Sequence, residues 1–242
     1  SWCEKKAEQF APYITDTGNY IAAALSNHQK VVLEAQLGAM RDIDYGIFPY
    51  TSSSSTISAY GPIGAGIPGT LPDHIVGVLK AYSTCVGAGP FTAEKAMPEK
   101  WMESLRKSGG EYGAATGRPR RVGPFEAVAS AYGLKCQNAD KIALTKLDVL
   151  SHMDEIPVIT SYKLNDEIIT EFDPLDDLDS MTPVIQTLPG WNTDISKCRK
   201  YEELPENARK YIETLEHLLN HEIQFISVGA ERNQYLTKGE WL

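Results

Sequence analysis

Three apolar segments of this chain are each followed at once by polar residues or glycine, and this arrangement constrains the fold more than any other feature. The segments are VVLEAQLG (31–38), IALTKLD (142–148) and IQFISVGAER (223–232). Helical patterns lie between them, and strands that alternate with helices form mostly parallel sheets covered by helices. We therefore predict an α/β fold with a mostly parallel central sheet and flanking helices. Ligands of such sheets bind beyond the carboxyl ends of the strands, so the residues after each segment are candidates for a site.

The other elements follow from periodicity and from turn residues. A helix over 2–27 is predicted to break at Pro12, and a small β-hairpin is predicted around Asn165. A helix over 205–220 begins at Pro205, and its apolar residues lie on one face, namely Ala208, Tyr211, Ile212, Leu215, Leu218 and Leu219. The remaining predictions are strands over 30–36, 81–86, 141–150 and 223–229 and helices over about 73–81, 101–110 and 124–134.

Residues 45–72 contain no charged side chain and are rich in glycine, proline and serine. A loop of this length is usually either functional or a flexible linker. Pure linkers rarely contain large apolar residues. This segment holds five of them, which are Ile47, Phe48, Tyr50, Tyr60 and Ile63. We therefore expect a partly ordered binding loop.

The composition excludes several classes of protein. The net charge is −9, whereas nucleic-acid-binding proteins need a basic face, so we expect no nucleic acid partner. We also expect no membrane span and no secretory signal. The four cysteines are far apart and form no CxxC pair, which indicates reduced thiols of a cytoplasmic protein. We treat residues 1–242 as one domain and, because the chain begins at Ser1 directly in a helical pattern, as part of a longer protein.

The segment GAATGRPRRVG (113–123) places three arginines in four positions of an acidic chain. Guanidinium groups are planar, and two of their N–H groups can donate parallel hydrogen bonds to a carboxylate or a phosphate. Glycine permits close backbone approach, and Thr116 supplies a hydroxyl. The segment therefore predicts an anion-binding loop, with a solvated basic turn as the alternative.

In TKLD (145–148), Lys146 and Asp148 follow the second apolar segment. A carboxylate only accepts hydrogen bonds. It can accept two at once from guanine, one from N1–H and one from the amino group. Adenine has no N1–H, so an aspartate in this position would select guanine. The lysine stem can cover the purine face. The alternative is that Asp148 caps the next helix.

Two further patterns resemble metal sites without their full requirements. His217 and His221 are four residues apart, but no third zinc ligand is evident. The acidic segment 173–179 lacks the glycine and the alternation of a calcium loop. We expect no metal at either place.

Taken in order, several segments resemble the adenylosuccinate synthetase family of purine-pathway ligases. They are DIDYGIFPYTSSSS (42–55), KAYSTCVGAGPF (80–91), GAATGRPRRVGPFEAVA (113–129), TKLDVL (145–150), PGW (189–191), YEELPENARKYI (201–212) and ISVGAER (226–232). The resemblance runs through nearly the whole chain and implies the C-terminal portion of that family's P-loop-like fold.

The resemblance also implies a reaction. The γ-phosphoryl group of GTP moves to the 6-oxygen of IMP, and the amine of L-aspartate then displaces the phosphate. Carried over by motif, the aspartate-binding residues are Thr116, Arg118 and Arg120. The GTP-binding residues are Arg120, Lys146, Asp148, Ser227, Gly229 and Ala230. The IMP-binding residues are Gln36, Ser52, Val86, Gly87 and Arg118.

Some positions depart from the family pattern. Counted back from Asp42, Leu37 occupies the place of the glutamine that hydrogen-bonds the purine 6-oxygen, and only a one-residue shift would let Gln36 replace it. Ala115, Ala230 and Cys85 stand in place of a threonine, a proline and an arginine. Two alternatives therefore stay open: a relative that acts on a 2-aminopurine nucleotide such as dGMP, and a non-catalytic paralogue that binds guanine nucleotides.

The family's Gly-rich phosphate loop, general-base aspartate, acid histidine and magnesium ligands find no match in this chain. The resemblance places them upstream, so it assigns no catalytic residue and no metal ligand here. It implies GTP as co-substrate, Mg²⁺ and a homodimer for the complete enzyme. We expect the chain alone to be inactive.

Overall fold

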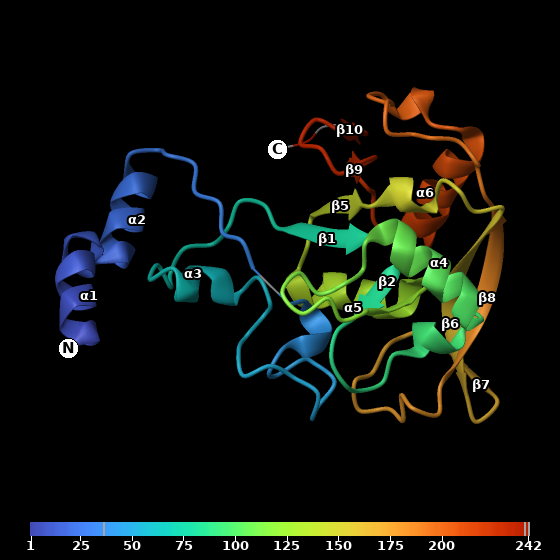
Figure 1. Cartoon of the computed structure of the whole chain (residues 1–242), viewed down its shortest axis with the longest axis horizontal. Helices are drawn as coiled ribbons and strands as arrows, with labels where there is room; N and C mark the ends of the chain where they lie inside the picture. Colours follow the sequence, from blue (N-terminus) through green and yellow to red (C-terminus); the bar gives the residue numbers. More distant parts are fainter. Residues whose placement is uncertain (36, 240, 242) are drawn as a thin grey trace.

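The computed structural model describes residues 1–35, 37–239 and 241, which form a helical arm and a mixed α/β body (Figure 1). The arm contains α1 (Trp2–Phe10) and α2 (Thr17–Ser26), joined by the 3₁₀ turn η1 (Ala11–Tyr13). The amide of Asn19 donates to the Asp16 carboxylate at the start of α2 (3.0 Å), which is a typical helix cap. The predicted break at Pro12 is confirmed.

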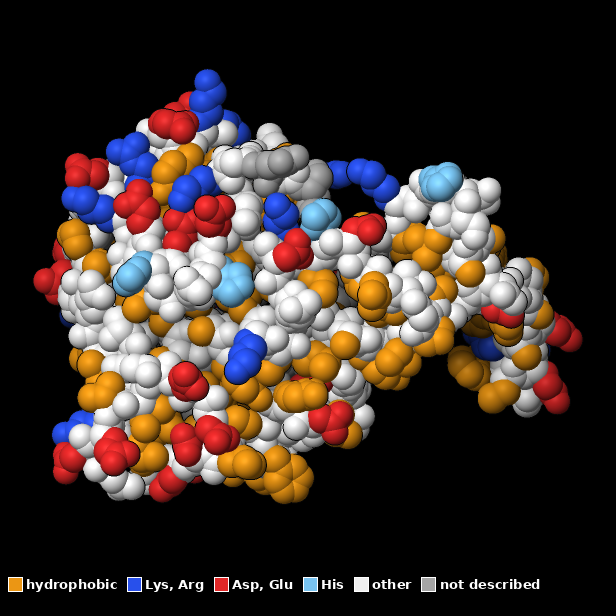
Figure 2. All heavy atoms as spheres, turned by 180° about the vertical axis from the view of Figure 1, so that it is seen from behind, with side chains coloured by type: hydrophobic (Ala, Val, Ile, Leu, Met, Phe, Trp, Pro, Cys, Tyr) orange, Lys and Arg blue, Asp and Glu red, His pale blue; other side chains and the backbone are white. Residues whose placement is uncertain are grey.

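The arm leaves its apolar side chains uncovered. α1 and α2, which lie wholly within the described part of the chain, bury no side chain. Figure 2 shows hydrophobic side chains on the surface of the arm, and the exposed large ones there include Trp2, Phe10, Tyr13, Ile14 and Tyr20.

The prediction of a strand over 30–36 is wrong for the described residues 30–35. Val32 is 89% exposed, and no described residue pairs with this segment. A strand needs hydrogen bonds to a neighbour, so an apolar sequence without a neighbour stays irregular. Gln36 itself lies outside the described residues.

The central sheet has the strand order β1 (Val76–Lys80), β5 (Lys141–Thr145), β9 (Phe225–Ser227) and β10 (Tyr235–Thr237). β1 pairs with β5 and β5 with β9 in parallel, while β10 is antiparallel. The expected mostly parallel sheet is therefore confirmed. The strands predicted over 141–150 and 223–229 are present but shorter, and in the former the 3₁₀ turn η4 (Leu147–Leu150) follows β5.

The predicted helix over 73–81 is wrong, because these residues contain β1. Proline and aspartate at 72 and 73 resemble a helix start. The carboxylate of Asp140, however, accepts a hydrogen bond from the amide of Ile75 (2.6 Å), and this contact directs the chain into the sheet. A Cβ on Gly77 would lie 2.5 Å from Leu134, so the strand passes close to α5 (Ala127–Gln137).

Two smaller sheets complete the strands. β2 (Ser83–Cys85) pairs antiparallel with β3 (Arg121–Gly123). In the other, β6 (Glu155–Leu164) pairs with β4 (Phe125–Glu126), β7 (Glu167–Ile169) and β8 (Thr182–Pro189). The hairpin of β6 and β7 is confirmed, since Asn165 and Asp166 have the positive φ values of a two-residue turn. The sequence did not predict β8 or β10.

Helices pack on the central sheet around one apolar core (Figure 1). α4 (Glu99–Gly109), α5 and α6 (Glu206–Leu219) contribute the fully buried or nearly buried residues Leu105, Leu134 and Leu215. Of the residues predicted for the apolar face of α6, five are buried and Leu218 is half-buried. No helix of the described residues has the length and apolarity needed to cross a membrane.

Part of the segment 45–72 packs against the rest of the chain. It contains the short helix α3 (Tyr60–Gly64), and its residues Ile47 and Ile67 are buried. Just before it, the 3₁₀ turn η2 (Ala39–Arg41) leads to Asp42, whose buried carboxylate accepts hydrogen bonds from the amide of Thr56 (2.6 Å) and from two amides of its own turn. Burial raises the pKa of Asp42, but these hydrogen bonds outweigh it and lower the pKa below its usual value.

Candidate functional site

The carboxyl ends of the neighbouring parallel strands β1 and β5 meet at one buried carboxylate, that of Glu111. Glu111 follows α4 and is fully buried. Its carboxylate accepts hydrogen bonds from Tyr82 Oη (2.7 Å), Lys80 Nζ (2.9 Å) and Arg120 Nη1 (2.9 Å) and lies 3.2 Å from Lys146 Nζ. Burial disfavours the charge, but the hydrogen bonds from Tyr82 and Lys80 and the neighbouring cations outweigh burial and lower the pKa of Glu111 to about 2.

The Glu111 cluster, which consists of Glu111 with these four partners, joins separate parts of the sequence. Lys80 ends β1 and Lys146 follows β5, while Arg120 belongs to the arginine segment. Sequence analysis missed Glu111, because one sequence does not show that a carboxylate is buried. The one available signal was an acidic residue just after a helix C-terminus, where cations are usually favoured.

The structure directs the three arginines of segment 113–123 to different places. Arg120 pairs with Glu111, and Arg121 forms an ion pair with Glu94. Arg118 is exposed, and no described carboxylate pairs with its guanidinium. Of the three, Arg118 is therefore the arginine most available to an external anion.

Thr116 and Arg118 lie at the exposed tip of a closed loop. The amide of Gly113 donates to the carbonyl of Arg118 (2.9 Å), and the amide of Gly117 donates to the carbonyl of Gly113 (2.7 Å). These contacts close the loop on itself and leave its tip in solvent. A small dianion can therefore bind at the tip without any change in the pairing of the strands.

Asp148 lies on η4 and is half-buried beside an open pocket of about 440 Å³. The pocket is lined by Ser108, Asp148, Val149, Ser151, His152, Asn192, Thr193 and Asp194. Burial raises the pKa of Asp148, Lys146 opposes this effect, and the charge of Asp194 adds to it. Within the described residues, η4 has no side-chain cap, so the alternative in which Asp148 caps a helix is not observed.

Lys146 adopts a left-handed backbone conformation with φ of 60°. Its ammonium group donates to the carbonyl of Gly109 (2.6 Å) as well as contacting Glu111. These contacts hold the head of the side chain in place, so its stem has a fixed position next to η4.

β9 lies beside η4, and the chain after β9 turns back into the antiparallel strand β10. Ser227 Oγ donates to the carbonyl of Gly229 (3.0 Å). A Cβ on Gly229 would lie 2.3 Å from Oε1 of Gln234, so a larger residue there would displace the end of the Gln234 side chain. Ser227, Gly229 and Ala230 thus occupy the same sheet edge as Asp148.

Three of the five residues assigned to IMP, which are Ser52, Val86 and Gly87, lie on two neighbouring loops. The amide of Ser52 donates to the carbonyl of Arg41 (2.8 Å), and Arg41 Nη2 donates to the carbonyl of Val86 (3.1 Å). Val86 and Gly87 lie in the turn after β2. Among the described residues, no hydrogen bond connects this pair of loops with Thr116 or the Arg118 side chain. Leu37 is largely exposed, with φ of 69°.

The described residues contain no group of three or more His, Cys, Asp or Glu side chains arranged to hold a metal ion. His221 Nδ1 lies 2.9 Å from the carbonyl of Leu219, and the pair with His217 gains no third partner.

A family model described as adenylosuccinate synthetase matches residues 1–236 of this chain. The chain belongs to the adenylosuccinate synthetase family. Among its relatives, the adenylosuccinate synthetase of Carboxydothermus hydrogenoformans is 42% identical over 94% of the chain, and that of Clostridioides difficile is 40% identical over 96%. The match covers 53% and 54% of those proteins, so the chain spans about half the length of the curated relatives it matches.

Solved structures agree with this assignment. The fully ligated adenylosuccinate synthetase of Plasmodium falciparum matches 97% of the chain and 58% of its own length, with a TM-score of 0.89 and 36% identity. A succinoaminodeoxyadenylate synthetase from cyanophage S-2L, solved with dGMP and dATP, covers 93% of the chain and 50% of its own length, with a TM-score of 0.50 and 14% identity. The phage likeness shows a shared fold alone, whereas the Plasmodium structure shows both family and fold.

Proposed function

We propose that the protein containing this chain is a GTP-dependent ligase that joins L-aspartate to IMP and forms adenylosuccinate. GTP, IMP and aspartate become GDP, phosphate and adenylosuccinate. This chain contributes the aspartate loop, the guanine pocket and part of the IMP site. The observation that carries the proposal is the convergence of Arg120 and Lys146 on Glu111, because it joins the segment proposed for aspartate to the segment proposed for guanine.

Aspartate binding is assigned to the loop over 113–123. Arg118 and the hydroxyl of Thr116 hold the carboxylates of aspartate, and Arg120 lies between this loop and the nucleotide. A fixed aspartate brings its amine to C6 of the activated purine, and such positioning supplies a large part of the rate in two-substrate reactions.

Guanine selection is assigned to Asp148. Burial raises the pKa of Asp148, and the neighbouring ammonium of Lys146 acts in the opposite direction and favours the carboxylate. The carboxylate accepts from N1–H and from the amino group of guanine, and the stem of Lys146 covers the ring. Ser227, Gly229 and Ala230 complete the pocket from the turn after β9.

The groups that move the phosphoryl group are not assigned to this chain. Mg²⁺, when bound, neutralises the charge of the transferred phosphate. No metal-binding cluster occurs in the described residues, so no residue here is given that role. We propose that residues 1–242 act as one part of a homodimeric, cytoplasmic enzyme and that they do not turn over substrate by themselves. The free state of all four cysteines supports a reducing compartment.

A second candidate is a ligase that acts on a 2-aminopurine nucleotide such as dGMP. Leu37 favours it, since a leucine side chain cannot donate a hydrogen bond to the 6-oxygen of IMP. Sequence identity favours IMP, because the phage enzyme solved with dGMP is only 14% identical to this chain. A third candidate is a guanine-nucleotide-binding paralogue without turnover.

A substrate screen of the complete protein separates the three candidates. The protein is incubated with GTP, aspartate and either IMP or dGMP, and the succinylated product is identified by mass. We expect a succinylated product in the reaction with IMP and none in the reaction with dGMP. Product with dGMP would establish the second candidate, and GTP binding without any product would establish the third.

A further inference from the structure

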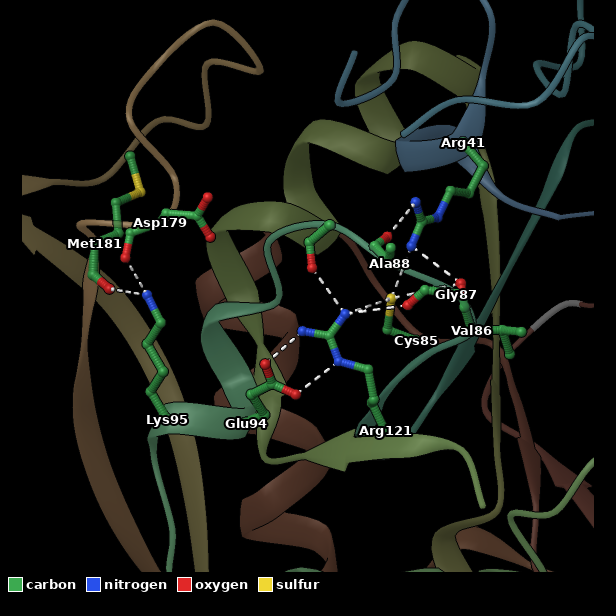
Figure 3. Close-up of polar contacts among 11 residues, drawn as sticks. Arg41, Cys85, Val86, Gly87, Ala88, Glu94, Lys95, Arg121, Asp179 and Met181 are labelled. Atoms are coloured by element: carbon green, nitrogen blue, oxygen red, sulfur yellow. Dashed lines mark hydrogen bonds and ion pairs between the residues drawn. The ribbon is translucent and has the colours of Figure 1, made fainter. Parts of the chain in front are cut away.

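The guanidinium of Arg41 lies at the junction of the two loops assigned to IMP (Figure 3). Nη1 donates to the carbonyls of Tyr50 (2.5 Å) and Ala88 (3.1 Å). Nη2 donates to Cys85 Sγ (2.9 Å) and to the carbonyl of Val86 (3.1 Å). One half-buried side chain therefore binds both the serine-rich loop and the turn that follows β2.

The main chain of Arg41 adds a contact on the same side. Its carbonyl accepts the hydrogen bond from the amide of Ser52. The two loops also touch directly, because a Cβ on Gly89 would lie 2.6 Å from Cγ of Tyr50. Gly89 has φ of +107°, a conformation that favours glycine. The position of Ser52 is thus tied to that of the turn over 86–89.

A second guanidinium holds the same turn. Arg121 Nη1 donates to the carbonyls of Gly87 (3.2 Å) and Gly89 (2.8 Å), while the rest of its guanidinium pairs with Glu94 (Figure 3). All four carbonyls of residues 86–89 therefore accept hydrogen bonds from arginine. In the described part of the chain, the amides of 87–89 donate to no acceptor. The turn consequently offers N–H donors to a ligand and keeps its acceptors occupied.

We propose that Arg41 is a positioning residue of the nucleotide-substrate site. Arg41 holds the Tyr50–Ser52 segment and the turn over 86–89 in one arrangement, so that the hydroxyl of Ser52 and the amides of the turn meet oxygen atoms of the substrate together. The identity of that substrate as IMP rests on the proposed function. The small side chain of Cys85 leaves the space that the Arg41 guanidinium fills.

The test compares Arg41→Met with Lys95→Met. Methionine keeps most of the stem and removes the donors. Lys95 is the matched control, because its ammonium also donates to two backbone carbonyls, those of Asp179 and Met181, but it does not contact the turn over 86–89 (Figure 3). Two readouts are taken from each variant. The first is the mobility of the two loops, measured by hydrogen–deuterium exchange of peptide 48–54 and by backbone NMR order parameters of residues 86–89. The second is the dissociation constants for IMP and GTP.

We expect Arg41→Met to speed exchange in peptide 48–54 and to lower the order parameters of residues 86–89, and Lys95→Met to do neither. We expect the dissociation constant for IMP to rise by about tenfold or more, as for the loss of hydrogen bonds from a charged donor, while that for GTP stays within about twofold. Unchanged order parameters of residues 86–89, or equal losses for IMP and GTP, would overturn the proposal.

Two further outcomes are informative. If the unaltered protein binds no IMP, the IMP assignment fails, and the mobility of the two loops alone decides whether Arg41 couples them. If Arg41→Met does not fold, Arg41→Lys takes its place. A single ammonium cannot reach all four acceptors, so the same selective increase in loop mobility is required of that variant, and its absence would overturn the proposal.

Discussion

Lys146 Nζ lies 3.2 Å from the buried carboxylate of Glu111, and this contact connects the segment proposed for guanine binding with the arginine loop. Arg120 reaches the other oxygen of the same carboxylate at 2.9 Å. The two binding segments are separated in sequence but share one anion. Their relative position therefore depends on a residue that touches neither proposed ligand.

The first prediction concerns Glu111→Gln. The substitution keeps the shape and removes the charge, which leaves three cations near an uncharged group. Removing one partner of a buried ion pair costs about 3–5 kcal/mol, and because the cations are partly exposed we expect about 3 kcal/mol. Urea denaturation measures the loss of unfolding free energy.

Glu126→Gln is the control, since Glu126 is also buried and bonded to a tyrosine, Tyr162, but no described cation pairs with it. Equal losses in both variants at pH 7 would contradict the prediction.

The second prediction concerns pH. Burial raises the pKa of Glu126 to about 7, although hydrogen bonds from Tyr162 and from the amide of Ala93 act in the opposite direction. Between the unfolded pKa of 4.5 and the folded value, the native state binds more protons than the unfolded state. The contribution of Glu126 to stability is therefore full below pH 4.5 and is lost as pH rises to about 7.

Chemical denaturation of the unaltered chain and of Glu126→Gln across pH 4.5–8 isolates this effect. The stability of the unaltered chain relative to the variant should fall by about 3 kcal/mol over that range, at 1.36 kcal/mol per pKa unit. A difference that stays constant with pH would show that Glu126 titrates normally.

The third prediction separates two arginines of the same segment. Arg121 is bound to Glu94 and to the carbonyls of Gly87 and Gly89, so Arg121→Met should destabilise the chain by about 1–3 kcal/mol. Arg118 is exposed, so Arg118→Met should stay within about 0.5 kcal/mol while it weakens aspartate binding. Thermal unfolding and aspartate titration measure the two effects. An Arg121→Met variant as stable as the unaltered chain would contradict the structural role of Arg121. A clear loss of stability in Arg118→Met would contradict the assignment of Arg118 to ligand binding alone.

The fourth prediction concerns Gly89→Ala. Its Cβ would lie 2.6 Å from the Tyr50 ring, and φ is +107°. Strain and overcrowding together should cost about 3 kcal/mol. Gly117→Ala is the control, because φ is +64° there and nothing lies within 4 Å of the added Cβ, so we expect about 1–2 kcal/mol. Similar losses of unfolding free energy in the two variants would mean that the loops do not touch as described.

The elements that sequence analysis predicted correctly are those set by local patterns. The apolar face of α6 repeats over four turns, and the β6–β7 hairpin is marked by Asn165 and Asp166. The apolar segments followed by polar residues also predicted that Lys146, Asp148 and Ser227 lie at or just beyond strand ends. In the structure Ser227 ends β9, Lys146 follows β5, and Asp148 lies in η4 directly after it.

The errors arise where a distant segment decides the structure. Residues 30–35 have a strand-like composition but no described partner, and Val76–Lys80 form a strand because β5 lies beside them. β8 begins and ends near prolines and exists through its pairing with β6. Glu111 is a site residue only because three cations from other elements meet it. None of these partners can be recognised within a short window of the sequence.

The central claim is that Asp148 recognises guanine, and a calorimetric titration tests this claim most directly. GTP, ATP and xanthosine triphosphate are titrated into the chain, into Asp148→Asn, and into Asp194→Asn as a control from the same pocket. We predict that the unaltered chain binds GTP and not ATP. Asp148→Asn should lose at least about tenfold in GTP affinity and gain affinity for xanthosine triphosphate, because the asparagine amide donates to the 2-oxygen of xanthine. Equal binding of GTP and ATP, unchanged GTP affinity in Asp148→Asn, or no nucleotide binding by the unaltered chain would contradict the claim.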